Sequence, residues 1–142
     1  MIAQTIQLAL APVFLLVAIG NILNILSARL GRVVDRSRTL LDRHGSTSGI
    51  DHEMVVREIR AVDRRIALIG RAIGLLVVSG LTIGLTVAIL FVEELAGLNL
   101  QRVAAGTFLV AIALLMWALT LYLHETWIAS ASLRIPRDFL EL

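Results

Sequence analysis

The chain has 142 residues, of which 58% are hydrophobic and 17% charged, and its mean hydropathy is +0.87. Because soluble globular domains are less apolar than this, the composition predicts an integral membrane protein, and the length predicts a single domain. The net charge of only +2 argues against a nucleic-acid-binding surface, and the absence of cysteine excludes disulfides and thiolate metal sites.

The first apolar segment, residues 8–28, is predicted to cross a membrane. Its 21 residues reach roughly 31 Å as a helix, which matches the hydrocarbon core of a bilayer. No positive charge precedes the segment and the arginines follow it, so it differs from a cleavable signal peptide. Pro12 lies near its start, where a missing N–H costs least.

Asn21 and Asn24 lie three residues apart on one face of this span, and neither should face lipid. The favoured interpretation is that the two amides form hydrogen bonds with other helices and so fix the register of packing. The alternative is that they line a hydrated path, because polar residues inside membranes are concentrated along such paths.

The segment 29–71 holds ten of the thirteen arginines, whereas the loop 93–102 holds one. Since arginine-rich segments next to spans stay on the cytoplasmic side, we expect this segment and the tail 124–142 in the cytoplasm and the N-terminus outside. Arginines at the helix ends are expected to contact anionic lipid headgroups. These are Arg29, Arg32, Arg65 and Arg71.

Apolar residues keep a heptad spacing beyond both membrane boundaries. The repeat runs through Leu26, Leu30, Val33 and Leu40 before a polar turn at 45–49. After the turn it returns through Val55, Ile59, Val62, Ile66, Ile69, Ile73 and Leu76. The pattern predicts two continuous helices, packed as an antiparallel cytoplasmic hairpin that extends about 15 residues, or roughly 22 Å, beyond the membrane.

His44 and His52 flank the turn of this hairpin, beside several acidic residues. The favoured interpretation is a tip that is polar for solubility. A divalent metal site is the weaker alternative, because the spacing matches no known ligand pattern. We expect no cofactor.

Residues 72–92 form the second predicted span and residues 103–123 the third, which returns the chain to the cytoplasm. Small residues on the second span predict close contact with another helix, through Gly70, Gly74, Gly80 and Gly84. Hydroxyl side chains of the same span can bond to their own helix or to Asn21, which lies at a similar depth, or can line a polar path. These are Ser79, Thr82 and Thr86.

Glu125 follows the third span, at the boundary where Arg29 leaves the first span and Arg71 enters the second. An unpaired carboxylate there would be costly, so we expect it to pair with one of these guanidinium groups. A proton-relay role for His124 and Glu125 is the alternative.

Three short motifs carry a resemblance to a known family. They are Asn24 followed by Arg29, Asp35, Arg36 and Arg38, then the pair Arg64 and Arg65, and finally Glu125. With these motifs the chain resembles a bacterial family of small membrane proteins that is catalogued as a domain of unknown function. The resemblance covers almost the whole chain and implies three spans and no assigned activity. We expect the protein in the cytoplasmic (inner) membrane of a bacterium.

The sequence therefore predicts an all-α membrane protein whose first hypothesis of function is a non-enzymatic module. Such a module self-associates or serves as a small subunit of a membrane complex, in contact with the lipid bilayer and with no nucleic acid. The alternative is a homo-oligomeric ion channel or transport protein in which Asn21 and Asn24 line the path, and it requires several copies because three helices cannot enclose a pore. No catalytic triad, metal-ligand motif or phosphate-binding glycine loop occurs, so we expect no enzyme.

Overall fold

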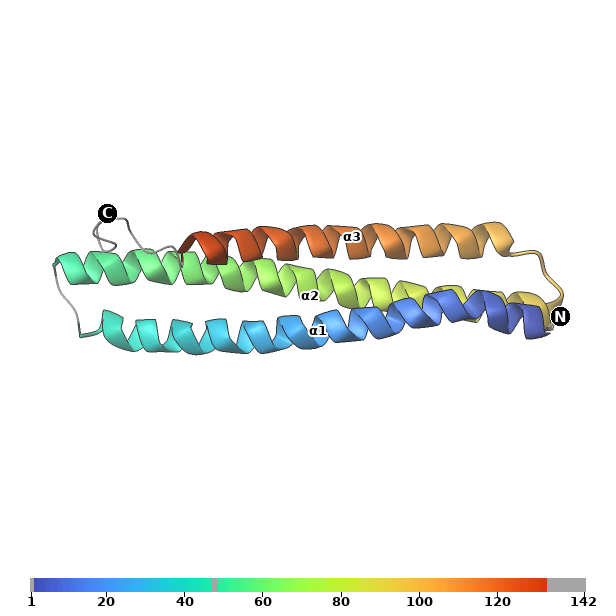
Figure 1. Cartoon of the computed structure of the whole chain (residues 1–142), viewed down its shortest axis with the longest axis horizontal. Helices are drawn as coiled ribbons and strands as arrows, with labels where there is room; N and C mark the ends of the chain where they lie inside the picture. Colours follow the sequence, from blue (N-terminus) through green and yellow to red (C-terminus); the bar gives the residue numbers. More distant parts are fainter. Residues whose placement is uncertain (1, 47–48, 133–142) are drawn as a thin grey trace, which may run out of the picture.

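The computed structural model describes residues 2–46 and 49–132, with side chains described as far as residue 127. This part of the chain forms three helices and no strand: α1 (Ile2–His44), α2 (Ile50–Ala96) and α3 (Gln101–Ser132). The helices lie side by side, and α2 packs against both α1 and α3 (Figure 1). Each helix is long and apolar enough to cross a membrane, which confirms the predicted all-α membrane class. Residues 47–48 of the predicted turn and 133–142 of the tail lie outside the described residues.

The helices differ from the predicted spans mainly at their ends. Helix α1 begins at Ile2, so Pro12 lies inside a helix rather than near its start and has no N–H for the carbonyl of Leu8. Both α1 and α2 run without interruption through the boundaries expected near residues 28 and 72. Helix α2 ends where Gly97 adopts the left-handed conformation, at φ 67°.

A strict heptad repeat holds α1 against α2. The buried residues of α1 include Ile19, Leu26, Val33 and Leu40, each seven residues from the next. They share one hydrophobic cluster with Val62, Ile69, Leu76 and Ile83 of α2, which repeat in the same way. The partly buried Leu30, Ile59, Ile66 and Ile73 pack against this cluster, so the predicted heptad residues are the ones that form the contact. A sustained seven-residue repeat also predicts that the helices coil around each other with a left-handed twist.

Small residues form the contact between α2 and α3. The buried positions of α3 include Ala104, Ala111 and Ala118, again seven residues apart, and those of α2 include Ala72, Ser79 and Thr86, with the same spacing. Ser79 donates a hydrogen bond to the carbonyl of Ala111 at 2.7 Å, which places a side chain of one helix on the backbone of the other. Two helices approach this closely only where both present small side chains.

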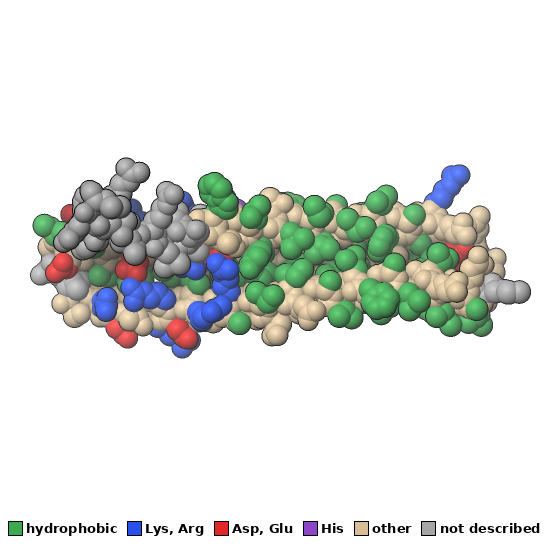
Figure 2. Space-filling model, viewed as in Figure 1, with side chains coloured by type: hydrophobic (Ala, Val, Ile, Leu, Met, Phe, Trp, Pro, Cys, Tyr) green, Lys and Arg blue, Asp and Glu red, His purple; other side chains and the backbone are tan. Residues whose placement is uncertain are grey.

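Charged and apolar side chains separate along the length of the bundle. In Figure 2 most of the charged side chains gather at the end formed by the last part of α1 and the first part of α2, a few lie at the opposite end, and hydrophobic side chains cover much of the length between them. Many large apolar side chains of the three helices are exposed, including Phe14 and Leu81, each 70% exposed. An apolar surface of this extent is typical of a protein surrounded by lipid.

Candidate functional site

The contact between α2 and α3 contains an ion pair. Glu125 lies seven residues after Ala118, and Arg65 lies seven residues before Ala72, so each continues the repeat of its own helix. The helix packing therefore brings the two side chains together as a further layer of the contact. Glu125 is only 1% exposed and is the one buried charged residue among those whose burial is described.

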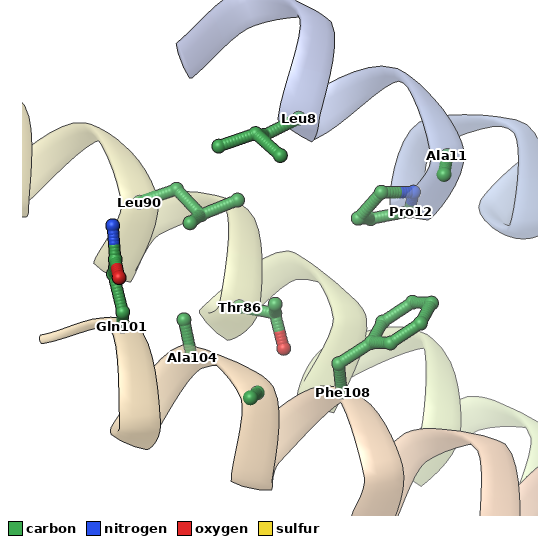
Figure 3. Close-up of a pocket in the computed structure, with 9 residues that line it drawn as sticks. Leu8, Ala11, Pro12, Thr86, Leu90, Gln101, Ala104 and Phe108 are labelled. Carbon is green, nitrogen blue, oxygen red and sulfur yellow. The ribbon is translucent and has the colours of Figure 1, made fainter. Parts of the chain in front are cut away.

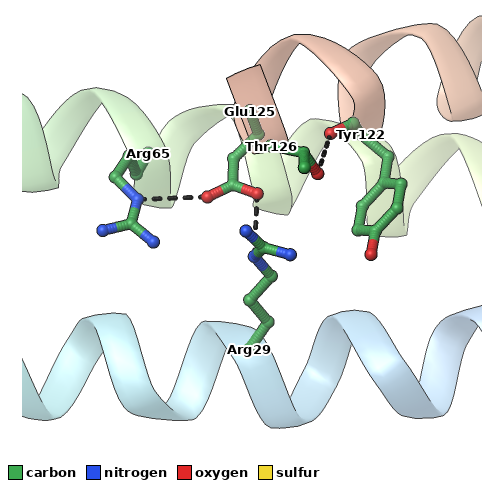
Figure 4. Close-up of polar contacts among 5 residues, drawn as sticks. All are labelled: Arg29, Arg65, Tyr122, Glu125 and Thr126. Carbon is green, nitrogen blue, oxygen red and sulfur yellow. Dashed lines mark hydrogen bonds and ion pairs between the residues drawn. The ribbon is translucent and has the colours of Figure 1, made fainter. Parts of the chain in front are cut away.

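Two guanidinium groups hold this carboxylate, one on each side (Figure 4). Arg65 Nε donates a hydrogen bond to Oε1 of Glu125 at 3.1 Å. Arg29 Nε lies 2.8 Å from Oε2, where it makes an ion pair without an aligned hydrogen bond. The three charged side chains come from α1, α2 and α3, so a single carboxylate joins all three helices. We call these three residues the carboxylate clamp.

An aromatic ring supports the α1 side of the carboxylate clamp. The guanidinium carbon of Arg29 lies 5.6 Å from the centroid of the Tyr122 ring, within the range of a cation–π contact. Thr126, beside Glu125, donates a hydrogen bond to the Tyr122 carbonyl at 2.9 Å, which is a local bond within α3. Arg29 therefore contacts α3 through both a carboxylate and a ring.

The clamp differs in one member from the pairing expected from the sequence. Arg29 is present as predicted, but Arg65 takes the second place and Arg71 is exposed. Six residues separate Arg65 from Arg71, so at 3.6 residues per turn the two side chains leave α2 in different directions. The sequence contains a signal for Arg65, because Arg65, Ala72, Ser79 and Thr86 form one series in which each residue lies seven positions after the one before. His124, the other residue of the proton-relay alternative, is exposed.

The hydroxyl groups of α2 form hydrogen bonds with groups other than the side chains of Asn21 and Asn24. Ser79 bonds to α3, and Thr82 donates to the carbonyl of Val78 in its own helix. Thr86 donates to the Thr82 carbonyl at 2.9 Å, and its hydroxyl also lies 2.8 Å from that of Thr107. None of these hydroxyls bonds to Asn21. Asn21 and Asn24 are both exposed, and their amides make no hydrogen bond within the described part of the chain.

One of the four glycines expected in helix packing contacts another helix within the chain. A Cβ placed on Gly80 would lie 3.7 Å from the side chain of Leu16 and 3.9 Å from that of Ile19. The other three positions, Gly70, Gly74 and Gly84, face open space. Any helix that packs on those three must therefore come from outside the described chain.

The charged end of α1 and α2 contains contacts that the sequence analysis missed. Arg36 Nε donates to Oε1 of Glu58 at 3.1 Å, which joins the two helices. The rings of His44 and His52 approach to 4.4 Å between centroids, and no group of three or more possible metal ligands occurs in the described ranges. Arg32 is exposed, as an arginine that contacts lipid headgroups would be.

Comparison with known proteins identifies a family. The family model described as "Protein of unknown function (DUF2721)" matches residues 9–135, which is most of the chain. This match confirms the resemblance that the asparagine and arginine motifs indicated. No match is found among curated proteins or among solved structures.

The carboxylate clamp predicts the outcome of a double-mutant cycle. Glu125→Gln should lower the stability measured by thermal unfolding in detergent, because it leaves two guanidinium groups without their carboxylate. The loss should be about 3 kcal/mol, as for a buried ion pair, rather than under 1 kcal/mol as for a surface pair. Combined with Arg65→Gln, it should cost clearly less than the two separate losses added together. Arg71→Gln is the control and should be additive with Glu125→Gln; additivity of Arg65→Gln as well would contradict the pairing.

Proposed function

We propose a function for this chain, which belongs to the DUF2721 family, from the face of α1 that no other described helix covers. The chain is a non-enzymatic membrane module that associates with further copies of itself. The observation that supports this most is the exposure of Asn21 and Asn24 in the middle of a helix long and apolar enough to cross a membrane. An amide that faces lipid without a partner loses its hydrogen bonds, so a protein surface should cover it.

The residues around the two asparagines suit a second helix. Gly20, Asn24, Ser27 and Gly31 follow one another at spacings of four, three and four, so they form one stripe on α1. All four are exposed, and nothing lies within 4 Å of where a side chain on Gly20 or Gly31 would begin. We call this the small-residue stripe. Small residues let two backbones approach, and the polar ones add hydrogen bonds across the contact.

A second copy of the chain is the partner that the small-residue stripe fits best. An asparagine amide both donates and accepts, so Asn24 can pair with Asn24 of another copy. Such a contact is isologous, with the same surface on both sides of a two-fold axis. The glycines that face open space on α2, Gly70, Gly74 and Gly84, offer a further surface for assembly into a larger complex.

The channel hypothesis has less support. A water-filled path needs polar groups along its length, but Ser79 is 0% and Thr86 2% exposed, and both bond within the chain. Asn21 and Asn24 are exposed and remain available for a path. A ring of several copies with the asparagines facing its axis would be the arrangement that favours conduction.

The orientation that accompanies this function places the arginine-rich end of α1 and α2 in the cytoplasm, as an antiparallel hairpin at a bacterial cytoplasmic membrane. The arginine count supports this side, and the pair of Arg36 with Glu58 supports a packed hairpin. The exposed guanidinium groups of Arg32 and Arg71 are then placed to contact anionic headgroups.

Cross-linking tests the self-association. The chain has no cysteine, so Ser27→Cys introduces a single thiol on the small-residue stripe. This variant should form covalent dimers in membranes under mild oxidation, whereas Ala113→Cys, at an exposed position of α3, should not. Adding Asn24→Leu to Ser27→Cys should lower the dimer yield, since the loss of an interhelical hydrogen bond weakens association by about tenfold. Equal yields from Ser27→Cys and Ala113→Cys would contradict the interface.

Thiol labelling tests the orientation. Ser46→Cys, at the exposed tip next to α1, should react with a membrane-impermeant reagent only after the cytoplasmic side is opened. Asn99→Cys, in the exposed loop between α2 and α3, should react in intact cells and serves as the opposite control. Reaction of Ser46→Cys in intact cells would reverse the proposed topology.

A further inference from the structure

The three helices line an open cavity at the end of the bundle away from the arginine-rich segment 29–71. Its volume is about 410 Å³, within the range of small-molecule sites, which is about 300–1,000 Å³. Leu8 and Pro12 of α1, Leu90 of α2, and Ala104 and Phe108 of α3 point toward the same space (Figure 3). Most of these side chains belong to segments predicted to cross the membrane, so a molecule that fills this space comes from the bilayer.

A smaller, polar cavity continues this one toward the end of the bundle. Its volume is about 130 Å³, and it shares Leu8, Leu90 and Gln101 with the larger cavity. Its other lining residues include Thr5, Glu93 and Glu94, and the described residues that line it include no lysine, arginine or histidine. The two cavities together therefore form an apolar space with an acidic mouth. This combination suits an amphiphile, which has an apolar chain and a polar head.

The mouth contains acceptors that lack donors. Oε2 of Glu93 is buried and accepts no hydrogen bond from the described residues. The carbonyl of Leu8 lacks its ordinary helical donor, because the residue four positions later is Pro12. A buried carboxylate oxygen without a donor is costly, so the mouth favours a molecule that supplies both N–H groups and positive charge.

We propose that this cavity binds a membrane aminolipid, with its primary ammonium group at Glu93 and an acyl chain between Pro12, Leu90 and Phe108. A primary ammonium group carries N–H donors that can bond to the free Oε2 of Glu93, and its bond to a carboxylate is charge-assisted. In the lipid the phosphate is bonded between the ammonium group and the acyl chain, so it faces water across the open side of the two cavities. The site is formed within one copy of the chain and does not depend on the small-residue stripe.

Native mass spectrometry of the full chain in nonionic detergent tests the headgroup preference. The protein is mixed with equal amounts of phosphatidylethanolamine, phosphatidylcholine and phosphatidylglycerol that carry the same acyl chains. Phosphatidylcholine is the sharpest comparison, because its ammonium group has the same charge but no N–H donor. The chain should retain phosphatidylethanolamine about tenfold better than phosphatidylcholine, the difference that one hydrogen bond to a charged group makes.

Two variants with matched controls locate the site. Glu93→Gln should abolish the preference, whereas Glu53→Gln, an exposed glutamate near the other end of α2, should keep it. Ala105→Phe fills the larger cavity from an exposed position and should release the retained lipid, whereas Ala113→Phe, the same change elsewhere on α3, should not. Retention of the two zwitterionic lipids in equal amounts by the unaltered chain would overturn the proposal. A preference that persists in both Glu93→Gln and Ala105→Phe, or a preference for phosphatidylglycerol, would also overturn it.

Discussion

The carboxylate of Glu125, shared between Arg29 and Arg65, is the interaction on which the arrangement of the three helices depends. Helix α2 packs on both of its neighbours along their lengths, but α1 and α3 contact each other much less. The ion pair of Arg29 with Glu125 and the contact of Arg29 with Tyr122 are therefore direct links between α1 and α3. Because Glu125 is 1% exposed, removing one of its arginine partners leaves a buried charge incompletely paired, which is strongly destabilising.

The clamp and the outer cavity are consequences of the same packing. At the clamp, long side chains from all three helices meet. Toward the other end α3 presents small residues such as Ala104 to the space between the helices, and α1 and α3 leave room beside Pro12 and Phe108. The bundle thus has an ion pair that joins the three helices at the clamp and a cavity between them toward the other end. That end is also where Glu93 retains an oxygen without a donor.

Much of this architecture could be predicted from the sequence. Apolar runs of 21 residues predicted three membrane-length helices, and the heptad residues from Leu26 to Leu76 predicted which faces of α1 and α2 meet. The length of α1 could not be predicted, because polar residues such as Gln4 and Thr5 interrupt the apolar pattern before residue 8, although the helix begins at Ile2. Of the two arginines that hold Glu125, Arg29 could be predicted and Arg65 could not. Arg65 and Arg71 both lie near the expected membrane boundary, so depth does not distinguish them. Only the register of the small residues between α2 and α3 shows that Arg65 faces Glu125. The partners of Ser79 and Thr86 depend on that same register, which hydropathy does not report.

The central claim is that Glu125 holds α1 to α3, and a distance measurement by pulsed electron paramagnetic resonance tests it most directly. Nitroxides at Ile25 of α1 and Leu123 of α3, both exposed and close in sequence to clamp residues, report on this end of the bundle. In Glu125→Gln their distance distribution should broaden and shift to longer distances, whereas labels at Val13 and Val110, exposed positions farther from the clamp, should give the unaltered distribution. An unchanged distribution between Ile25 and Leu123 in Glu125→Gln would contradict the claim.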